Sequence, residues 1–177
     1  MSFFNHKHNG KFNTAPKADR TWGSVVFDSR LEMLIAQTIL VAFKPEQIHI
    51  WRQFKFELIP TQREGGLPKG RLIFKERRMS PDFLIRNPEN TRPDAYLVID
   101  AKGMMLPDFV LRTAIFYWRY KHEIYCVKSP KDLLKVPWGT IGLQPDNEIF
   151  LNGRKRNERI RECNVTEQLS RFISPAV

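Results

Sequence analysis

The chain has 177 residues, 42% of them hydrophobic and 12% aromatic, with 29 Lys and Arg against 19 Asp and Glu. This composition can bury a core of ordinary size and argues against wholesale disorder. No run of about 18 apolar residues occurs, which excludes a membrane-spanning helix. The net charge of +10 favours a polyanionic partner, of which nucleic acid is the commonest.

The N-terminus and the cysteines suggest a cellular setting. The first residues lack the apolar stretch of a secretory signal. Cys126 and Cys163 form neither a metal-binding pair nor a disulfide framework. We therefore expect a reducing, cytoplasmic location and no membrane partner.

The first third of the chain predicts an arm, a helix and a strand. Residues 1–23 are polar and basic, as in a flexible arm. Apolar residues three or four apart predict a helix over 29–43, with Ser29 and Glu32 as a capping box and Lys44-Pro45 as its end. Residues 47–59 alternate between apolar and polar side chains, which predicts a half-buried strand.

The middle of the chain predicts several short strands and one long helix. Residues 60–70 and 87–93 are turns, and strands are expected over 71–78 and 80–86. The apolar run 95–101 is typical of a central strand. A helix is expected over 107–120 with Tyr117 and Tyr120 in the core, then a strand over 122–128. A further basic helix is expected over 154–172.

This order predicts an α/β fold: a mixed central sheet flanked by helices, in the order helix, strands, helix, strand, with a strand–helix–strand crossover. Residues 130–177 are set apart as a basic C-terminal extension of unknown role.

Two short motifs carry the functional hypothesis. Asp82 follows Pro81 at the start of an expected strand, and Asp100-Ala101-Lys102 ends the apolar central strand. Residues two apart on a strand share a face, so Asp100 and Lys102 project together. Mg²⁺ takes one or two protein carboxylates, so Asp82, Asp100 and the carbonyl of Ala101 could hold it. The structural alternative is a surface Asp–Lys pair and a Pro-Asp turn.

Glu32 has two open interpretations. As the acidic member of a capping box it would stabilise the start of its helix. It also heads an apolar stripe, which directs a carboxylate toward the interior or a cleft, where it could join the metal site.

Basic residues beside aromatic ones are candidates for contacts with phosphates, with a solvated helix face as the alternative. They are Lys75, Arg77, Arg78, Arg112, Arg119, Lys121, Arg154, Lys155 and Arg156.

The order Ser29-x-x-Glu32, Pro81-Asp82, Asp100-x-Lys102 resembles the PD-(D/E)XK nuclease superfamily. More narrowly, the chain is similar to small phage-encoded proteins of unknown function that are related to bacteriophage endonuclease I-type Holliday junction resolvases. The similar segments, within residues 10–128, are KFNTAP, VVFDSRLE, QFKFELIP, SPDFLI and VIDAKGMMLPDFVLRTAIFYWRY. The long basic loop at 60–79 and residues 129–177 depart from this pattern.

The resemblance implies a restriction-endonuclease-like core over residues 24–129 that hydrolyses phosphodiester bonds in DNA, with Mg²⁺ or Mn²⁺ as cofactor. Asp82 and Asp100 would be metal ligands, Lys102 the catalytic lysine, and Glu32 a helix-borne acid that binds or positions metal. It also implies selectivity for branched DNA in phage recombination, replication or packaging, action as a homodimer, and a location in the host cytoplasm if a phage encodes the protein.

Two other classes remain open. One is a non-catalytic DNA-binding or assembly module of the same fold, against which the intact Asp82, Asp100 and Lys102 argue. The other is the strand-cleaving subunit of a transposase-like machine, which would show little activity without its partner. Metal titration separates the first from a nuclease.

Overall fold

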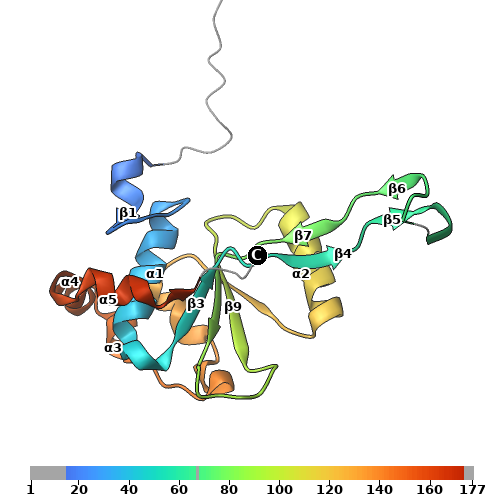
Figure 1. Ribbon diagram of the computed structural model, residues 1–177. Coiled ribbons are helices and arrows are strands. Elements are labelled where there is room, and N and C mark those ends of the chain that lie inside the picture. Colours follow the sequence, from blue (N-terminus) through green and yellow to red (C-terminus); the bar gives the residue numbers. More distant parts are fainter. Residues whose placement is uncertain (1–14, 67, 174–177) are drawn as a thin grey trace, which may run out of the picture.

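The computed structural model describes residues 15–66 and 68–173. It is a mixed α/β protein in which helices cover both faces of one mixed five-stranded sheet (Figure 1). The sheet has the order β10 (Ile124–Val127), β9 (Tyr96–Ala101), β8 (Phe83–Arg86), β3 (His49–Arg52) and β11 (Phe172–Ile173). The inner pairs β9–β8 and β8–β3 are antiparallel, and the outer pairs β10–β9 and β3–β11 are parallel.

Helix α1 (Arg30–Ala42) forms where the periodic pattern predicts it. The Ser29 side chain accepts a hydrogen bond from the Glu32 amide at 3.0 Å, which caps the first turn. The Glu32 carboxylate does not close the capping box on Ser29, because it accepts instead from the amide of Asp28. The helix packs Ile35, Ala36 and Ile39 onto one face of the sheet.

Helix α2 (Pro107–Tyr120) crosses the opposite face and connects β9 to the parallel strand β10, as expected. Pro107 occupies its first turn, where a missing amide hydrogen costs nothing. It ends at Lys121, whose φ of 58° is left-handed and whose amide donates to the carbonyl of Tyr117. Only Phe109 and Phe116 of this helix are buried, so the expectation that Tyr117 belongs to the core was wrong.

The predicted strand 47–59 is in fact two strands in two sheets. The backbone turns at Gln53, where φ is 51°, so β3 stays in the main sheet and β4 (Phe56–Ile59) leaves it. Strand β4 pairs with β7 (Arg77–Met79), and β5 (Gln62–Arg63) pairs with β6 (Leu72–Phe74) further out. These strands and the short helix η3 (Glu64–Gly66) form a long projection, which we call the basic hairpin, residues 54–66 and 68–79 (Figure 1).

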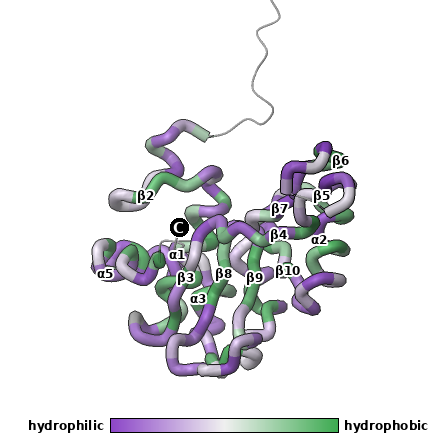
Figure 2. The backbone as a smooth tube through the Cα atoms, turned by 45° about the vertical axis from the view of Figure 1, so that its right-hand side comes forward, coloured by the Kyte–Doolittle hydropathy of each residue, from purple (hydrophilic) through white to green (hydrophobic). Residues whose placement is uncertain are grey.

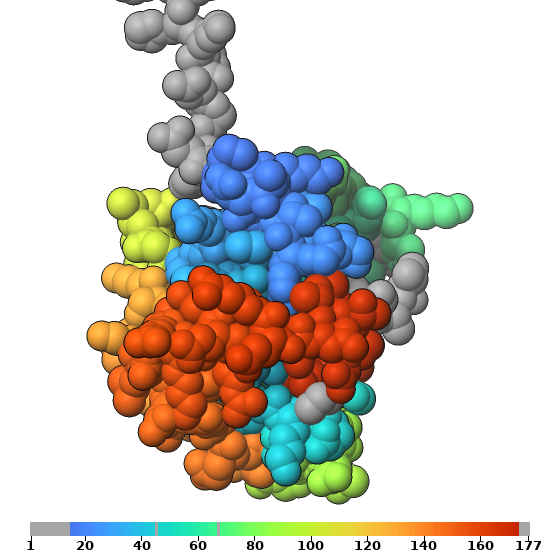
Figure 3. Space-filling model, turned by 90° about the vertical axis from the view of Figure 1, so that its left-hand side faces the viewer, coloured from blue at the N-terminus to red at the C-terminus, as the bar shows by residue number. Residues whose placement is uncertain are grey.

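The C-terminal residues, set apart in the sequence as an extension, pack into the main core. The segment contains η4 (Pro130–Lys135), η5 (Trp138–Ile141), α3 (Asn147–Leu151), α4 (Gly153–Glu162) and α5 (Val165–Ser170). Leu133, Trp138 and Phe150 are buried against the α1 side of the sheet. Figure 3 shows α4 and α5, in orange and red, covering this side of the molecule.

The single helix predicted over 154–172 is interrupted at Asn164, whose side chain caps α5. Arg171 is not on a solvated helix face either. It is buried and donates hydrogen bonds to the carbonyls of Leu40 and Phe43, which closes the C-terminal end of α1.

Residues 15–23 of the expected N-terminal arm fall within the described part of the chain. Residues 1–14 lie outside the described part of the chain, and η1 (Lys17–Arg20) and β1 (Thr21–Trp22) follow. Strand β1 pairs with β2 (Val25–Val26) through a turn at Gly23, where φ is +57° and a Cβ would lie 2.7 Å from a methyl of Leu169. The remaining short helix is η2 (Pro45–Gln47). No helix in the described residues has the length and apolar character needed to cross a membrane.

Candidate active site

Two carboxylates meet where β8 begins and β9 ends. Phe83 lies opposite Ile99 in antiparallel register, so continuing the register by one step places Asp82 opposite Asp100. Opposed residues of an antiparallel pair project from the same face, here the face that carries α2. The Asp82 Oδ2 atom accepts a hydrogen bond of 2.7 Å from the Ala101 amide, which fixes this carboxylate against β9.

Burial perturbs both acids. The pKa of Asp82 is raised from 3.8 to about 7, first by burial and then by the negative charges of Asp100 and Glu32. The pKa of Asp100 is also raised by burial, against a lowering influence from Lys102. Two buried carboxyl groups on neighbouring strands cannot both ionise cheaply unless a cation joins them. Such perturbed pairs are typical of functional sites.

Lys102 stands beside the pair, as expected. Its Nζ lies 3.3 Å from Asp100 Oδ1 and 4.8 Å from the centre of the Phe109 ring. The Lys102 side chain is 39% exposed and that of Asp100 only 3%, so the ammonium contacts both the buried carboxyl group and solvent. Among the described residues no donor makes a well-directed hydrogen bond to Asp100 Oδ1. The Lys102 ammonium therefore offsets only part of the cost of burying this oxygen, and a divalent cation would offset more of it.

The structure does not bring Glu32 to these carboxylates. Glu32 is 1% exposed, and its two oxygens accept hydrogen bonds from the Asp28 amide at 2.9 Å and from Arg52 Nη2 at 3.0 Å. The Arg52 guanidinium is itself held 4.3 Å above the centre of the Phe27 ring. Glu32 therefore acts on Asp82 through its charge rather than as a neighbouring ligand.

The residues at the site fit a hard divalent cation. Mg²⁺ takes one or two carboxylates and fills its other positions with water and phosphate, so Asp82 and Asp100 suffice. No group of three His, Cys, Asp or Glu side chains suited to a metal ion occurs within residues 15–66 and 68–173. The Ala101 amide donates a hydrogen bond to Asp82, and the role of the Ala101 carbonyl as a metal ligand stays a prediction.

Gln53 is a part of the site that the sequence did not indicate. Its amide donates to the Asp82 carbonyl at 3.1 Å, and its side chain donates to Asp28 Oδ2 at 2.6 Å. A left-handed φ at a residue other than glycine costs energy and often occurs near functional groups. The alternating pattern of 47–59 runs through Gln53 without interruption, so only the structure reveals this turn.

Cys126 is a second neighbour of the acids. It pairs with Asp100 across the parallel strands β10 and β9. Burial, followed by the charge of Asp100, raises the pKa of the Cys126 thiol to about 11. The thiol is therefore protonated at pH 7 and is an uncharged neighbour of Asp100.

The expected phosphate-binding residues fall into two groups. Lys75, Arg77 and Arg78 lie on the basic hairpin, and Arg112, Arg119 and Lys121 lie on or next to α2. Arg112 pairs with Asp108, Arg119 with Glu57, and Arg78 with Glu76. These exposed pairs are weak enough to exchange for phosphates.

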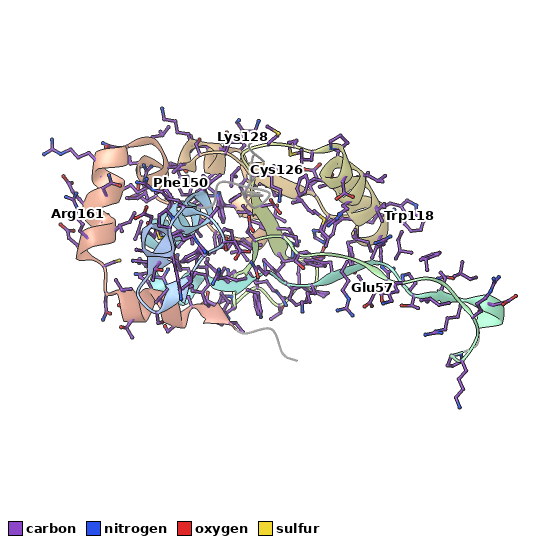
Figure 4. The ribbon with its side chains drawn as sticks, turned by 90° about the horizontal axis from the view of Figure 1, so that it is seen from above. Glu57, Trp118, Cys126, Lys128, Phe150 and Arg161 are labelled. Carbon is purple, nitrogen blue, oxygen red and sulfur yellow. The ribbon has the colours of Figure 1, made fainter. Side chains whose placement is uncertain are left out.

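The other group, residues 154–156, lies on α4. Arg154 pairs with Glu158, and Lys155 pairs with Asp146 and Glu148. Figure 4 shows Arg161 of this helix and Trp118 of α2 at opposite ends of the molecule. The structure therefore does not bring residues 154–156 to the surface that holds the hairpin and α2.

No family model, no curated protein and no solved structure matches the chain.

Proposed function

We propose that the protein is a divalent-metal-dependent endonuclease that hydrolyses phosphodiester bonds in DNA. The observation that carries this proposal is the pairing of Asp82 with Asp100 beside the ammonium of Lys102. Two buried acids with raised pKa values and one lysine suit a site that takes up a cation and a phosphate. The net charge of +10 agrees with a polyanionic substrate.

Each residue has a distinct proposed role. Asp82 and Asp100 would hold Mg²⁺, for which Mn²⁺ would substitute, and the ion would supply positive charge against the negative charge that develops on the phosphate. Lys102 donates a hydrogen bond from Nζ to the attacking water and orients it toward phosphorus. Glu32 keeps Arg52 in place and is a positioning residue rather than a ligand.

We also infer a restriction-endonuclease-like core. Helix α1, the antiparallel strands β3, β8 and β9, the crossover helix α2 and the parallel strand β10 follow the order that the sequence resemblance implies. The acids lie at the end of β9 and the start of β8, on the side of the sheet that α2 covers.

The test is cleavage of a four-way junction, a fork and a linear duplex by the purified protein in Mg²⁺. Asp82→Ala and Lys102→Ala should abolish cleavage, a loss of at least about a hundredfold, because one removes a metal ligand and the other the group that orients water. Faster cleavage of the junction and fork than of the duplex supports selectivity for branched DNA. Equal nicking of all three removes that part of the proposal.

Matched controls separate chemistry from folding. Asp94→Ala changes an exposed acid at the other end of the β9 segment, and Lys131→Ala changes an exposed lysine on η4, so both should cleave normally. Undiminished cleavage by the Asp82 and Lys102 variants would refute the site. If the wild-type protein binds metal but does not cleave DNA, a transposase-like subunit is favoured. If it neither binds metal nor cleaves DNA, a non-catalytic module is favoured.

The expected homodimer has a candidate surface on α2. Val110, Leu111, Tyr117 and Trp118 are exposed on this helix, and Trp118 points away from the body in Figure 4. Exposed apolar patches of this kind mark protein contacts, and a patch on one helix can pair with its own copy about a two-fold axis. We propose that two copies join through α2, which would place their two active sites on one DNA substrate.

A further inference from the structure

The outer half of the basic hairpin exposes apolar side chains on both of its faces. Leu72, Ile73 and Phe74 of β6 are 40%, 61% and 40% exposed. Phe74 lies opposite Gln62 and Leu72 opposite Arg63, with Ile73 as the extra residue of a bulge. Because Gln62 and Arg63 are successive residues of β5, Leu72 and Phe74 project from opposite faces of the ribbon. Strand β6 pairs only with β5, and Figure 1 shows both extending beyond the body. Nothing in the described residues covers either face.

Cations surround this apolar strip. Six Lys and Arg lie between residues 62 and 79, against two Glu. Arg71 pairs with Glu64 at 3.3 Å, but both side chains are largely exposed, so water screens the pair. In the described part of the chain neither Lys75 nor Arg77 has an ion-pair partner. Figure 2 shows the hydrophilic colouring of residues around β5 and β7.

The hairpin and the candidate active site are one structural unit. The first leg of the hairpin follows Gln53, whose amide donates to the carbonyl of Asp82. The second leg ends at Met79, three residues before Asp82. The base packs on α2, where Phe56 and Phe116 have ring centres 4.9 Å apart and the Tyr120 hydroxyl donates to the Glu57 carbonyl at 2.9 Å. Whatever the hairpin holds is therefore positioned relative to Asp82.

Apolar side chains on both faces of a ribbon rich in Lys and Arg suit a groove rather than a flat partner. A flat protein surface would cover one face of the ribbon and leave the other in water. A nucleic-acid groove has two phosphate walls for the cations and a floor of base edges and thymine methyl groups for the apolar residues. The major groove is wide enough for a two-stranded ribbon.

We propose that the basic hairpin enters the major groove of the DNA duplex that flanks the scissile phosphate. Leu72, Ile73 and Phe74 contact the bases there, and Lys75 and Arg77 contact the phosphates. This inference rests on the proposed function only for the choice of DNA as the ligand, since it concerns binding and not cleavage.

The experiment measures binding of the full chain to a fluorescent duplex and a four-way junction by anisotropy, in EDTA so that no cleavage occurs. Each titration is repeated from 50 to 200 mM KCl. The apolar variant is I73S/F74S, the charge variant is K75A/R77A, and the control is Leu151→Ser. Leu151 lies on α3 and is 53% exposed, so it matches Ile73 in exposure but lies away from the hairpin.

The two kinds of variant should differ in salt dependence. I73S/F74S should weaken binding about tenfold with an unchanged slope against salt, because apolar contacts release no counterions. K75A/R77A should weaken binding and lower the slope by about two, because two phosphates would then keep their counterions when the protein binds. Leu151→Ser should bind like the wild-type protein.

Three outcomes overturn the inference. The first is wild-type affinity in I73S/F74S, and the second is a slope that I73S/F74S lowers. The third is sedimentation showing that I73S/F74S dissociates a wild-type dimer, which would make the strip a contact between copies of the chain. The expected binding pattern in a wild-type protein that neither binds Mg²⁺ nor cleaves DNA refutes the nuclease but not the groove contact. Cleavage by the wild-type protein, together with unaffected DNA binding by I73S/F74S, refutes the groove contact but not the nuclease.

Discussion

Asp82 carries the largest electrostatic cost among the site residues. Burial removes water from its carboxyl group, the negative charges of Asp100 and Glu32 add to that cost, and the Ala101 amide and the charge of Lys102 only partly offset it. The folded protein therefore holds a proton on Asp82 up to a pKa of about 7, whereas the unfolded chain releases it near 3.8. Without metal, the contribution of Asp82 to stability is therefore fully present below pH 3.8 and is lost as pH rises through about 7.

Asp82→Asn should remove the loss of stability that the ionisation of Asp82 causes as pH rises. At 1.36 kcal/mol per pH unit, the shift from 3.8 to about 7 corresponds to about 4 kcal/mol. We expect Asp82→Asn to match the wild-type protein near pH 4 and to be a few kcal/mol more stable at pH 8, because the amide keeps an acceptor for Ala101 without a charge. Urea unfolding without divalent metal checks this. A variant less stable than wild type at pH 8 would contradict it.

At the scale of elements, helix α2 is attached by few residues. Phe109 and Phe116 are its buried side chains, and Phe116 also contacts Phe56 at the base of the basic hairpin with the two rings at 90°. One aromatic side chain therefore joins the helix, the sheet and the hairpin. Its loss should affect both the stability of the fold and the orientation of the hairpin.

Phe116→Ala should lower the free energy of unfolding by about 3–5 kcal/mol, because it leaves a cavity at a fully buried position. Phe74→Ala is the matched control. It removes the same atoms from the exposed β6 strand and should change stability by no more than about 0.5 kcal/mol. Urea denaturation of both proteins measures the difference. Equal losses would mean that Phe116 does not join these elements.

For the whole molecule, the two ends have different surfaces. The end with α4 is charged, with Arg154 and Lys155 in ion pairs, whereas the end with α2 and the hairpin exposes large apolar side chains. Substrate and a second copy of the chain are therefore expected at the α2 end.

Leu111→Lys should convert the proposed dimer to a monomer, because a lysine in the centre of an apolar contact would have to be desolvated. Leu111 is 61% exposed, so the substitution should leave the fold intact. Sedimentation equilibrium over a range of concentrations measures the association. Leu151→Lys on α3 is the control and should associate like wild type. A monomeric wild-type protein would exclude the dimer.

The sequence by itself determined the elements that local patterns specify. The capped start of α1, the proline at the start of α2 and the apolar strand β9 follow from residues within one or two helical turns or one strand. The juxtaposition of Asp100 and Lys102 also follows, because strand periodicity alone places residues two apart on the same face.

Only the tertiary structure decided how distant segments meet. Three features depend on partners 20 to 131 residues away in the chain. They are the turn at Gln53, the ion pair of Glu32 with Arg52 and the burial of Arg171 against the end of α1. Local periodicity carries no record of such partners, because the pairing of polar groups is decided when packing removes water from them. The same reason explains why the C-terminal residues, whose short helices and two-residue strand carry weak local signals, nevertheless complete the core.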